Sequence, residues 1–500
     1  MTKDREFYKT FLRLMCALML QQAVVLSVNL ADNIMLGGYS ETALSGVSAV
    51  NQIQFILQQL TFAVINGMIV LSSQYWGQKR TGPIKALIAI AMKAALVIAA
   101  VLLLLVSLFP VQAVGFFTND PAIVAEGVGY LSIVRWSYLF FAFTNVLLGG
   151  MRTVEKVSIS LYVSLIALII NVSINYTLIT GHFGFPEMGA KGAAVGTLTA
   201  RVIESLIVAW YVLKKDCLLA LKPAELLGWD SGLFPDFVRV TTPLLLSQFF
   251  WGVNTALQTV ILGHMSSSAI AAHSISSTIF LFLKVMAVGA ASAASIIVGK
   301  TVGAAQTSAA HRETVSAAEK IGIVSGIDRK AGTTGTASIV SRKTSIANAA
   351  SITGISPASF AKIREYVRTL QILFILIGSL LAITLFFIRI PLLSLYSLSA
   401  ETAALSDIFI KIEATVIFVT SYQMCMNTGV ICGGGDTRYL TILDAVFIWC
   451  LVVPVSLLAA FYFHADPVTV LICLNCDQYL KCIPAFIYGN SYRWIRRLAK

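Results

Sequence analysis

Twelve long apolar stretches constrain the fold of this chain more than any other feature of its sequence. Each holds about 20 or more mostly apolar residues, the length that a helix needs to cross the hydrocarbon core of a bilayer. The stretches run over residues 11–35, 50–73, 84–108, 127–149, 158–180, 190–213, 240–263, 273–299, 366–388, 403–430, 440–463 and 467–489. The pattern predicts an all-α polytopic membrane protein with twelve transmembrane helices.

The composition excludes the main alternatives to a membrane protein. Hydrophobic residues make up 57% of the 500 residues and charged residues 12%, whereas a soluble globular domain carries about 25% charged residues. Such a chain cannot cover itself with polar surface, and it is too apolar for general disorder. Cys473 and Cys476 form a Cys-x-x-Cys in a mostly apolar stretch without a second ligand pair. We therefore expect neither a disulfide framework nor a structural metal.

The basic residues fall on one side of the predicted membrane. One set of connections is rich in Lys and Arg, whereas the short loops of the other set hold mainly Asp and Glu. Because basic residues accumulate in cytoplasmic loops, we expect a multi-pass protein of the cell membrane with both termini in the cytoplasm. This also accounts for the net charge of +12 without a nucleic-acid partner. The basic connections hold Lys79, Arg80, Arg152, Lys156, Lys214, Lys215, Lys222, Arg438, Arg493, Arg496 and Arg497.

An internal repeat relates the two halves of the chain. A shift of 226 residues places Leu36-Gly37 on Leu262-Gly263, and further identities follow without a gap. They pair Ser40 with Ser266, Ala43 with Ala269, Ser48 with Ser274, Ile53 with Ile279, Leu57 with Leu283 and Gly77 with Gly303. At a shift near 280, the loop at Arg152 matches the loop at Cys432. Because six spans return the chain to the same side, we expect parallel repeats about a pseudo-two-fold axis along the membrane normal, as in some secondary transporters.

The repeat divides the chain into two lobes. We expect a first six-helix lobe over residues 1–214, a cytoplasmic linker over 215–238 and a second six-helix lobe over 239–500. The second lobe contains an additional segment, 304–360, without an aromatic residue before Phe360. Its Ser, Thr, Ala and Gly residues cannot bury a core, which predicts a disordered cytoplasmic insert with a short helix near 309–323. A regulatory or lipid-binding insert is the alternative.

Six short motifs at characteristic places point to one family. They are Ser73-Gln74-Tyr75-Trp76-Gly77-Gln78, Asn171-Val-Ser-Ile-Asn175, Met188 to Thr197, Pro243 with Gln248 to Gly252, Gly433-Gly434-Gly435-Asp436-Thr437-Arg438, and Arg493-Trp494-Ile495. Their order and spacing, together with twelve spans in two sets of six, resemble the multidrug and toxic compound extrusion (MATE) family of cation-coupled antiporters. The resemblance covers nearly the whole chain except 304–360.

The resemblance implies two six-helix lobes around a central cavity, with a coupling site in the first lobe. On the family pattern this site consists of Asp32 in the first span, Asn171 and Asn175 in the fifth and Thr197 in the sixth. A Na⁺ ion would be held by Asp32, Asn171 and Thr197. Asn175 and Gln248 stand where relatives carry a carboxylate, and these departures favour H⁺ over Na⁺ as the coupling ion.

Asp32 stands out even without the resemblance. A charge well inside a span costs about 2.5–3.5 kcal/mol on insertion scales, so Asp32 should face a wet cavity or be neutralised. Asn171 and Asn175 are four residues apart and hence on one helical face. They can offer oxygens to a cation or hydrogen bonds to a carboxyl group. The alternative is that Asp32 lies close enough to the outer surface to reach water.

Three residues of the second half are assigned to the substrate cavity: Gln248, Trp251 and Lys284. Lys284 lies near the middle of its span, a depth from which its amine can hardly reach the membrane surface. It could attract anionic substrates or pair with an acid from another helix. Arg201 and Glu204, three residues apart, are interpreted as a self-neutralising pair.

These features predict a secondary active transporter rather than an enzyme. We expect efflux of organic cations, drugs or other amphipathic small molecules in exchange for H⁺ or Na⁺ by alternating access. We also expect a monomer in contact with membrane lipid and no cofactor beyond the coupling ion. The alternative is a flippase for lipid-linked or anionic amphipathic substrates, for which Lys284 is the main support. The chain lacks His-Glu-x-x-His, a convincing Ser/His/Asp arrangement and paired intramembrane aspartates, which disfavours a membrane enzyme.

Overall fold

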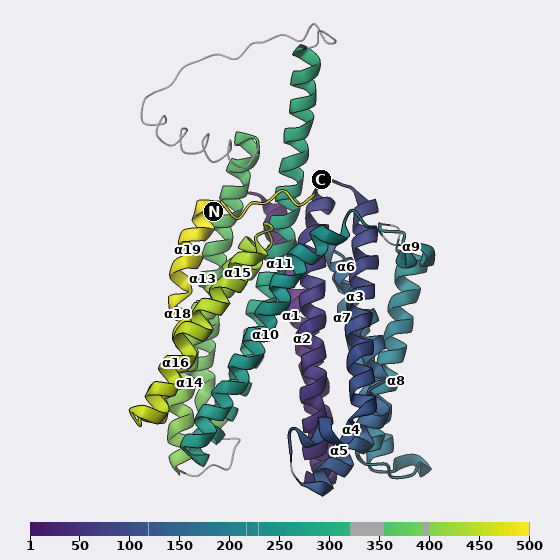
Figure 1. Ribbon diagram of the computed structural model, residues 1–500, viewed down its shortest axis with the longest axis vertical. Coiled ribbons are helices and arrows are strands. Elements are labelled where there is room, and N and C mark those ends of the chain that lie inside the picture. The colour runs from purple at the N-terminus through teal and green to yellow at the C-terminus, as the bar shows by residue number, and fades with distance from the viewer. Residues whose placement is uncertain (119, 217, 229, 321–354, 394–399, 500) are drawn as a thin grey trace.

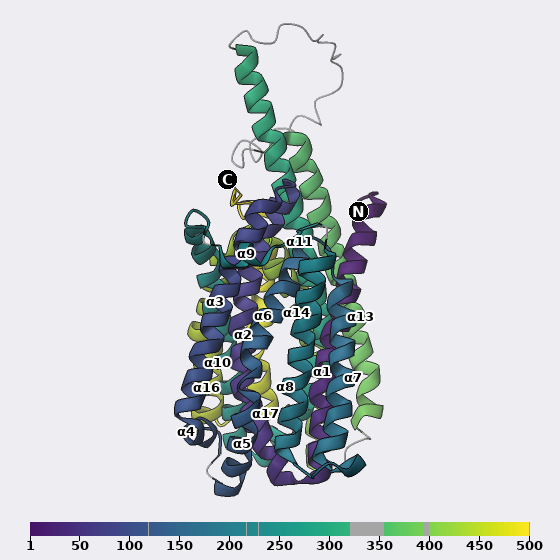
Figure 2. The same ribbon diagram turned by 90° about the vertical axis from the view of Figure 1, so that its right-hand side faces the viewer.

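The structure confirms the all-α prediction. The computed structural model describes residues 1–118, 120–216, 218–228, 230–320, 355–393 and 400–499, and these residues form helices and connections with no strand (Figure 1). Both termini lie toward the same end of the bundle, from which α11 (Ser267–Lys320) projects (Figure 1 and Figure 2). We call this the terminal end of the molecule.

The helices follow the predicted spans closely. The first half contains α1 (Arg5–Tyr39), α2 (Glu41–Gly77), α3 (Thr81–Leu108), α4 (Pro110–Gly115), α5 (Pro121–Val134), α6 (Ser137–Thr153), α7 (Ser158–Ile179), η1 (His182–Gly184), α8 (Ala190–Trp210) and η2 (Tyr211–Lys215). After α9 (Pro223–Leu227), the second half contains α10 (Phe234–Met265), α11, α13 (Pro357–Leu393), α14 (Ala400–Met424), η4 (Cys425–Ile431), α15 (Thr437–Asp444), η5 (Ala445–Val452), α16 (Val453–Leu457), η6 (Leu458–Tyr462), α17 (Pro467–Leu474), α18 (Cys476–Leu480) and α19 (Cys482–Ser491).

Most of these helices can cross a bilayer as single units. Within the described residues, nine helical segments are long and apolar enough to do so, and α5 with α6, bent by 52°, forms a tenth. The other two predicted spans, 240–263 and 403–430, coincide with α10 and with α14 plus η4. Each of the twelve apolar stretches therefore corresponds to a helix or to consecutive helices.

Short polar side chains mark where several helices begin. Asp4 accepts backbone N–H bonds from Glu6 and Phe7 at the start of α1, and Ser40 does the same from Ala43 at the start of α2. These side chains satisfy N–H groups that have no partner inside the helix. Because Ser40 is the only residue between α1 and α2, the chain reverses there within one residue.

Each half of the chain packs into its own bundle. In the first half, α1 contacts α7, α7 contacts α8, α8 contacts α5 and α6, and α6 and α2 contact α3. In the second half, α11 contacts α13 and α14, α14 contacts α17, α18 and α19, and α10 contacts α15. The halves meet where α2 packs against α10 and α11, and where α1 packs against α11. This arrangement agrees with two lobes related by the repeat.

The contact between the lobes near the terminal end follows the symmetry of the repeat. A Cβ at Gly77 would lie 2.0 Å from the carbonyl oxygen of Lys300, and a Cβ at Gly303 would lie 2.0 Å from that of Gln74. Gly77 and Gly303 are equivalent under the 226-residue shift, and so are Gln74 and Lys300. Each lobe thus presents a glycine at the same position, because only glycine allows the two backbones to approach so closely.

The neighbouring helices extend into both edges of the segment 304–360. Here α11 continues to Lys320 and α13 begins at Pro357. Residues 321–354, on which most of the disorder prediction falls, lie outside the described residues. Alanine-rich residues such as those from Ala304 to Lys320 favour helix, which is why α11 can run on beyond the bundle.

Candidate functional site

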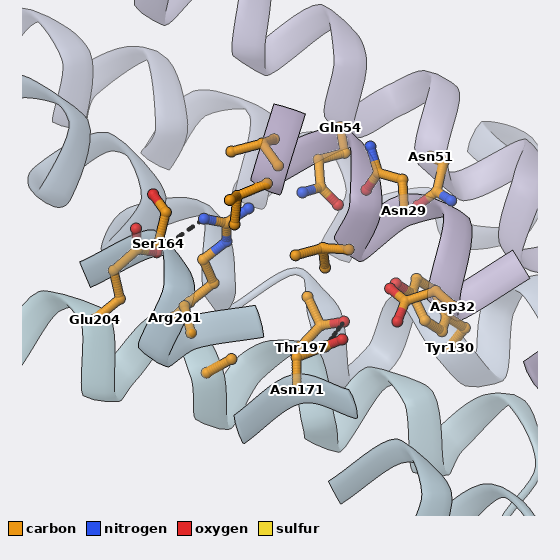
Figure 3. A pocket seen from close by; sticks show the side chains of 15 residues that line it. Asn29, Asp32, Asn51, Gln54, Tyr130, Ser164, Asn171, Thr197, Arg201 and Glu204 are labelled. Carbon is orange, nitrogen blue, oxygen red and sulfur yellow. Dashed lines mark hydrogen bonds and ion pairs between the residues drawn. The ribbon is translucent and has the colours of Figure 1, made fainter. Parts of the chain in front are cut away.

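A small polar cavity lies inside the first lobe, between α1, α2, α5, α7 and α8 (Figure 3). Its volume is about 40 Å³. A buried water needs roughly 10–15 Å³ on this scale, so the cavity can hold a few waters or an inorganic cation but no organic substrate. Its polar lining consists of Asn29, Asp32, Asn51, Gln54, Tyr130, Ser164, Asn171, Thr197, Arg201 and Glu204.

The structure brings the four predicted coupling residues together. Asn175 donates from Nδ2 to Asp32 Oδ1 at 2.6 Å and to Asn171 Oδ1 at 3.4 Å. Asn171 in turn donates from Nδ2 to Thr197 Oγ1 at 3.4 Å. The result is a continuous chain of hydrogen bonds from α1 through α7 to α8, with one carboxylate at its end.

The four residues joined by these hydrogen bonds differ in their burial. Asn171 and Asn175 are almost completely buried, whereas Asp32 and Thr197 are each 9% exposed. The cavity is lined by Asp32, Asn171 and Thr197. Asn175 does not line it but donates a hydrogen bond to Asp32. Gly196 makes this position possible, because a Cβ there would lie 2.0 Å from Asn175 Oδ1. A carboxylate so enclosed must bind a proton or a cation, or keep its charge at a cost.

Arg201 and Glu204 form the predicted pair but also belong to the site. Arg201 Nη1 lies 2.8 Å from Glu204 Oε2. Figure 3 shows this pair at one end of the cavity and Asp32 with Tyr130 at the other. With both carboxylates ionised, Asp32, Arg201 and Glu204 give the cavity a net charge of −1. Their spacing predicted a self-neutralising pair but carried no sign that the pair shares a cavity with Asp32.

Several lining residues were missed by the sequence analysis. Asn29 and Asp32, and likewise Asn51 and Gln54, are polar residues three apart within apolar spans. This spacing puts each pair on one helical face, a signal that could have identified the polar sides of α1 and α2. Tyr130 carried no such signal, because a buried tyrosine is common in apolar helices.

The three predicted cavity residues of the second lobe lie elsewhere, near the contact between the lobes. Gln248 donates to Gln59 of α2 at 3.2 Å, and the Trp251 ring lies 6.0 Å from that of Phe55. Lys284 Nζ lies 5.0 Å from the centre of the Trp251 ring, a cation–π distance. The structure thus brings Trp251 and Lys284 together, whereas Gln248 faces α2. The three residues do not line the cavity around Asp32.

A second cluster of buried charges lies among α10, α15 and α18. Lys481 Nζ is 2.9 Å from both Asp444 Oδ1 and Asp477 Oδ2. Ser247 donates to the second oxygen of Asp444 at 2.8 Å. Lys284 is attracted by the carboxylates of Asp477 and Glu413. The second lobe therefore places its buried carboxylates close to lysines of the same lobe.

A helical bundle with two similar lobes and a buried, hydrogen-bonded carboxylate defines a secondary-transporter type of membrane protein. Comparison with known proteins agrees with this class of protein. The MatE family model matches residues 17–177 and 243–327. The probable multidrug resistance protein NorM of Thermotoga maritima is 22% identical over 98% of this chain and 94% of its own length. The multidrug resistance protein MdtK of Klebsiella pneumoniae is 24% identical over 60% of this chain and 66% of its own length.

Solved structures show the same fold. A MATE structure in the bent conformation has a TM-score of 0.77 at 15% identity and covers 97% of this chain and 95% of that one. An outward-facing multidrug resistance MATE transporter has a TM-score of 0.75 at 16% identity and covers 98% of this chain and 97% of that one. The chain belongs to the MATE family, which confirms the resemblance drawn from the motifs, and it is a transporter rather than an enzyme.

Proposed function

We propose that this protein exports amphipathic organic compounds, organic cations and drugs among them, in exchange for protons by alternating access. The observation that carries the proposal is Asp32, a buried carboxylate in a cavity too small for an organic substrate. An antiporter needs a group whose occupation by the driving ion excludes the substrate-bound state of the protein. A carboxylate that gains and loses a proton has this property.

The hydrogen-bond pattern favours H⁺ over Na⁺. A Na⁺ ion needs several oxygen ligands, and Asp32, Asn171 and Thr197 could supply them. In this arrangement, however, amide N–H groups already bond to those oxygens: Asn175 Nδ2 to Asp32 and Asn171, and Asn171 Nδ2 to Thr197. Asp32 can take up a proton without rearranging these hydrogen bonds, whereas a Na⁺ ion would have to share oxygens that already accept amide N–H groups.

Substrate specificity and orientation are part of the same proposal. The names of the relatives from Thermotoga maritima and Klebsiella pneumoniae, both multidrug resistance proteins, support export of drug-like compounds. The Lys and Arg content of the connections supports a cytoplasmic location for the terminal end. We further propose a monomer surrounded by membrane lipid.

The charge balance of the second lobe argues against a flippase for anionic substrates. Such a transporter would need a cationic cavity. Lys284 and Lys481 instead lie among Glu413, Asp444 and Asp477, so this group has a net charge of −1 when all five are ionised. Lys284 therefore balances a carboxylate-rich region, and we favour cationic over anionic substrates.

Transport in proteoliposomes tests the proposal. An imposed pH gradient should drive export of a cationic dye by the parent protein, whereas a Na⁺ gradient alone should not. Asp32→Asn should reduce gradient-driven export to the background of empty vesicles, because an amide cannot exchange a proton. Asp120→Asn, at an exposed helix cap, is the matched control and should export normally. Normal export by Asp32→Asn would contradict the mechanism, and a strict Na⁺ requirement would contradict the choice of ion.

A further inference from the structure

Three sequence motifs remain without a role after the Asp32 site is described. They are the end of α2 around Gln74, the glycine-rich turn Gly433–Asp436 and the C-terminal segment around Trp494. The structure brings all three to one place at the terminal end, although Gln74 is more than 350 residues away from the other two in the chain. We therefore looked for the contacts that join these three motifs.

Gln74 of the first lobe is fully buried. Among the described residues, every hydrogen bond of its side chain goes to the second half of the chain. Its Nε2 donates to the carbonyl oxygens of Gly434 at 3.4 Å and Arg496 at 3.2 Å. Its Oε1 accepts from the backbone N–H groups of Leu498 at 3.1 Å and Ala499 at 3.4 Å. A glutamine amide offers two donors and two acceptor positions, and all four are used here.

The C-terminal segment is itself fixed to the second lobe. The Arg496 backbone N–H donates to Gly434 O at 2.9 Å, and Arg496 Nη2 lies 3.0 Å from Asp436 Oδ2. Trp494 is fully buried, and its ring packs so closely that a Cβ at Gly434 would lie 2.0 Å from it. This contact explains the glycine in the turn. Gln74 therefore joins the first lobe to a rigid part of the second.

A matching contact runs in the opposite direction. Lys300, the repeat equivalent of Gln74, forms an ion pair with Glu155 of the first lobe. Glu155 lies in the loop at Arg152, which matches the loop at Cys432 that contains Gly434. The residue at the same repeat position in each lobe thus binds the same loop of the other lobe. Such reciprocity is what a pseudo-two-fold axis between the lobes produces.

We propose that Gln74 and Lys300 form two symmetric locks that hold the terminal end closed, and that both must open before the substrate pathway can reach this side of the membrane. The Gln74 lock comprises Gln74, Gly434 and residues 496–499, and the Lys300 lock comprises Lys300 and Glu155. The proposal rests on the proposed function in one respect: only a transporter that alternates access has to open this end. Gln74 and Lys300 are positioning residues in the transport cycle.

Two natural cysteines can distinguish opening of the locks from general unfolding. Cys432 is buried beside Ala63 of the first lobe and Leu244 of α10, so separation of the lobes would expose its thiol. Cys425 is buried within the second lobe, where its Sγ lies 3.4 Å from Ala287 O. It should be exposed only if that lobe unfolds. Full-length chains that retain one of these cysteines and replace the other seven provide the two reporters.

The experiment measures the rate of maleimide alkylation of each reporter in nanodiscs, without any gradient. Gln74→Leu should speed alkylation of Cys432 at least tenfold and leave Cys425 unchanged. Lys300→Gln, at a partly exposed ion pair, should also speed the alkylation of Cys432. This second variant keeps the test valid if Gln74→Leu does not fold. Gln52→Leu, the same exchange at an exposed position of α2, should match the parent.

Parental alkylation of Cys432 in the folded lock variants would overturn the proposal. Equal acceleration at Cys432 and Cys425 would overturn it as well, because that result reports unfolding of the second lobe rather than separation of the lobes. Since no gradient or substrate is present, the outcome does not depend on the coupling ion. A parent that fails to export under a pH gradient would contradict the proposed function and leave this test intact.

Discussion

Both lobes bury carboxylates, but they surround them differently. In the first lobe, Asp32 receives a hydrogen bond from the neutral amide of Asn175. In the second lobe, Asp444 and Asp477 share the ammonium group of Lys481. The carboxylate of Asp32 thus has a neutral hydrogen-bond partner, whereas those of Asp444 and Asp477 have a buried cation as theirs. The comparison suggests one lobe for ion exchange and one for rigidity.

The largest effect on stability is expected at Lys481. Lys481→Met would leave Asp444 and Asp477 buried without their cation, which typically costs about 3–5 kcal/mol. Thermal unfolding in detergent should show this loss, and a second change, Asp477→Asn, should recover part of it. Lys411→Met, at a half-exposed lysine paired with Asp407, serves as the control. If Lys481→Met unfolds like the parent while Asp32→Asn is strongly destabilised, the roles of the two clusters are reversed.

Gly196→Ala should disturb the first lobe without changing any charge. The new Cβ would meet Asn175 Oδ1 at 2.0 Å, and overpacking of this kind costs roughly 1–3 kcal/mol. Because Asn175 then moves away from Asp32, export should fall by more than the loss of stability explains. Export rate and melting temperature should be measured on the same preparation. Gly252→Ala, where a Cβ would meet no atom within 4 Å, should export normally.

The ion pair of Asp216 with Lys156 lies outside the membrane spans. Its carboxylate can be compared with those of the Asp32 site and of the Lys481 cluster. Asp216 accepts from Lys156 Nζ at 2.6 Å and from the backbone N–H groups of Leu218 and Leu219. Burial opposes its ionisation, but these hydrogen bonds outweigh burial and hold the pKa of Asp216 below its usual value of 3.8.

A lowered folded-state pKa stabilises the protein above the unfolded value, and this stabilisation is lost as the pH falls through the folded value. Asp216→Asn should therefore cost roughly 1–3 kcal/mol at neutral pH. The difference in melting temperature from the parent should shrink below a pH of about 4. A difference that stays constant from pH 7 to pH 3 would show that the charge of Asp216 is not the cause.

The smallest effect is expected at Lys284. Lys284→Gln removes a cation that lies over the Trp251 ring, a contact worth about 0.5–1 kcal/mol at exposed sites and about 2 kcal/mol when desolvated. With Glu413 and Asp477 left in place, the second lobe becomes more anionic. The apparent KM for a cationic dye should fall a few-fold with little change in kcat. A collapse of cationic export in a folded Lys284→Gln protein would instead assign Lys284 to the coupling machinery.

Much of the fold followed from the sequence because its causes are local. The twelve spans depend on runs of apolar side chains, and helix starts such as that at Asp4 depend on one side chain and the next few N–H groups. Arg201 with Glu204 was equally predictable, because residues three apart on a helix are neighbours whatever surrounds them. The repeat predicted two lobes because it compares the chain only with itself.

The candidate site was predictable only in part. Asp32, Asn171, Asn175 and Thr197 were identified from a family pattern, but the position of each side chain depends on how three helices are rotated about their own axes. That rotation is set by the packing of whole helix faces. The same limit applies to Tyr130, whose place beside Asp32 has no signature in its own span.

The sequence by itself determined the membrane class, the spans, the repeat and the presence of one carboxylate within the first span. Only the tertiary structure decided that Asp32 meets Asn175 within one lobe, that Lys481 neutralises Asp444, and that Gln74 binds residues more than 400 positions away, at Leu498 and Ala499. The physical reason is that hydrophobic burial places helices in a membrane according to average composition. A hydrogen bond instead requires two particular atoms to lie within about 3 Å of each other.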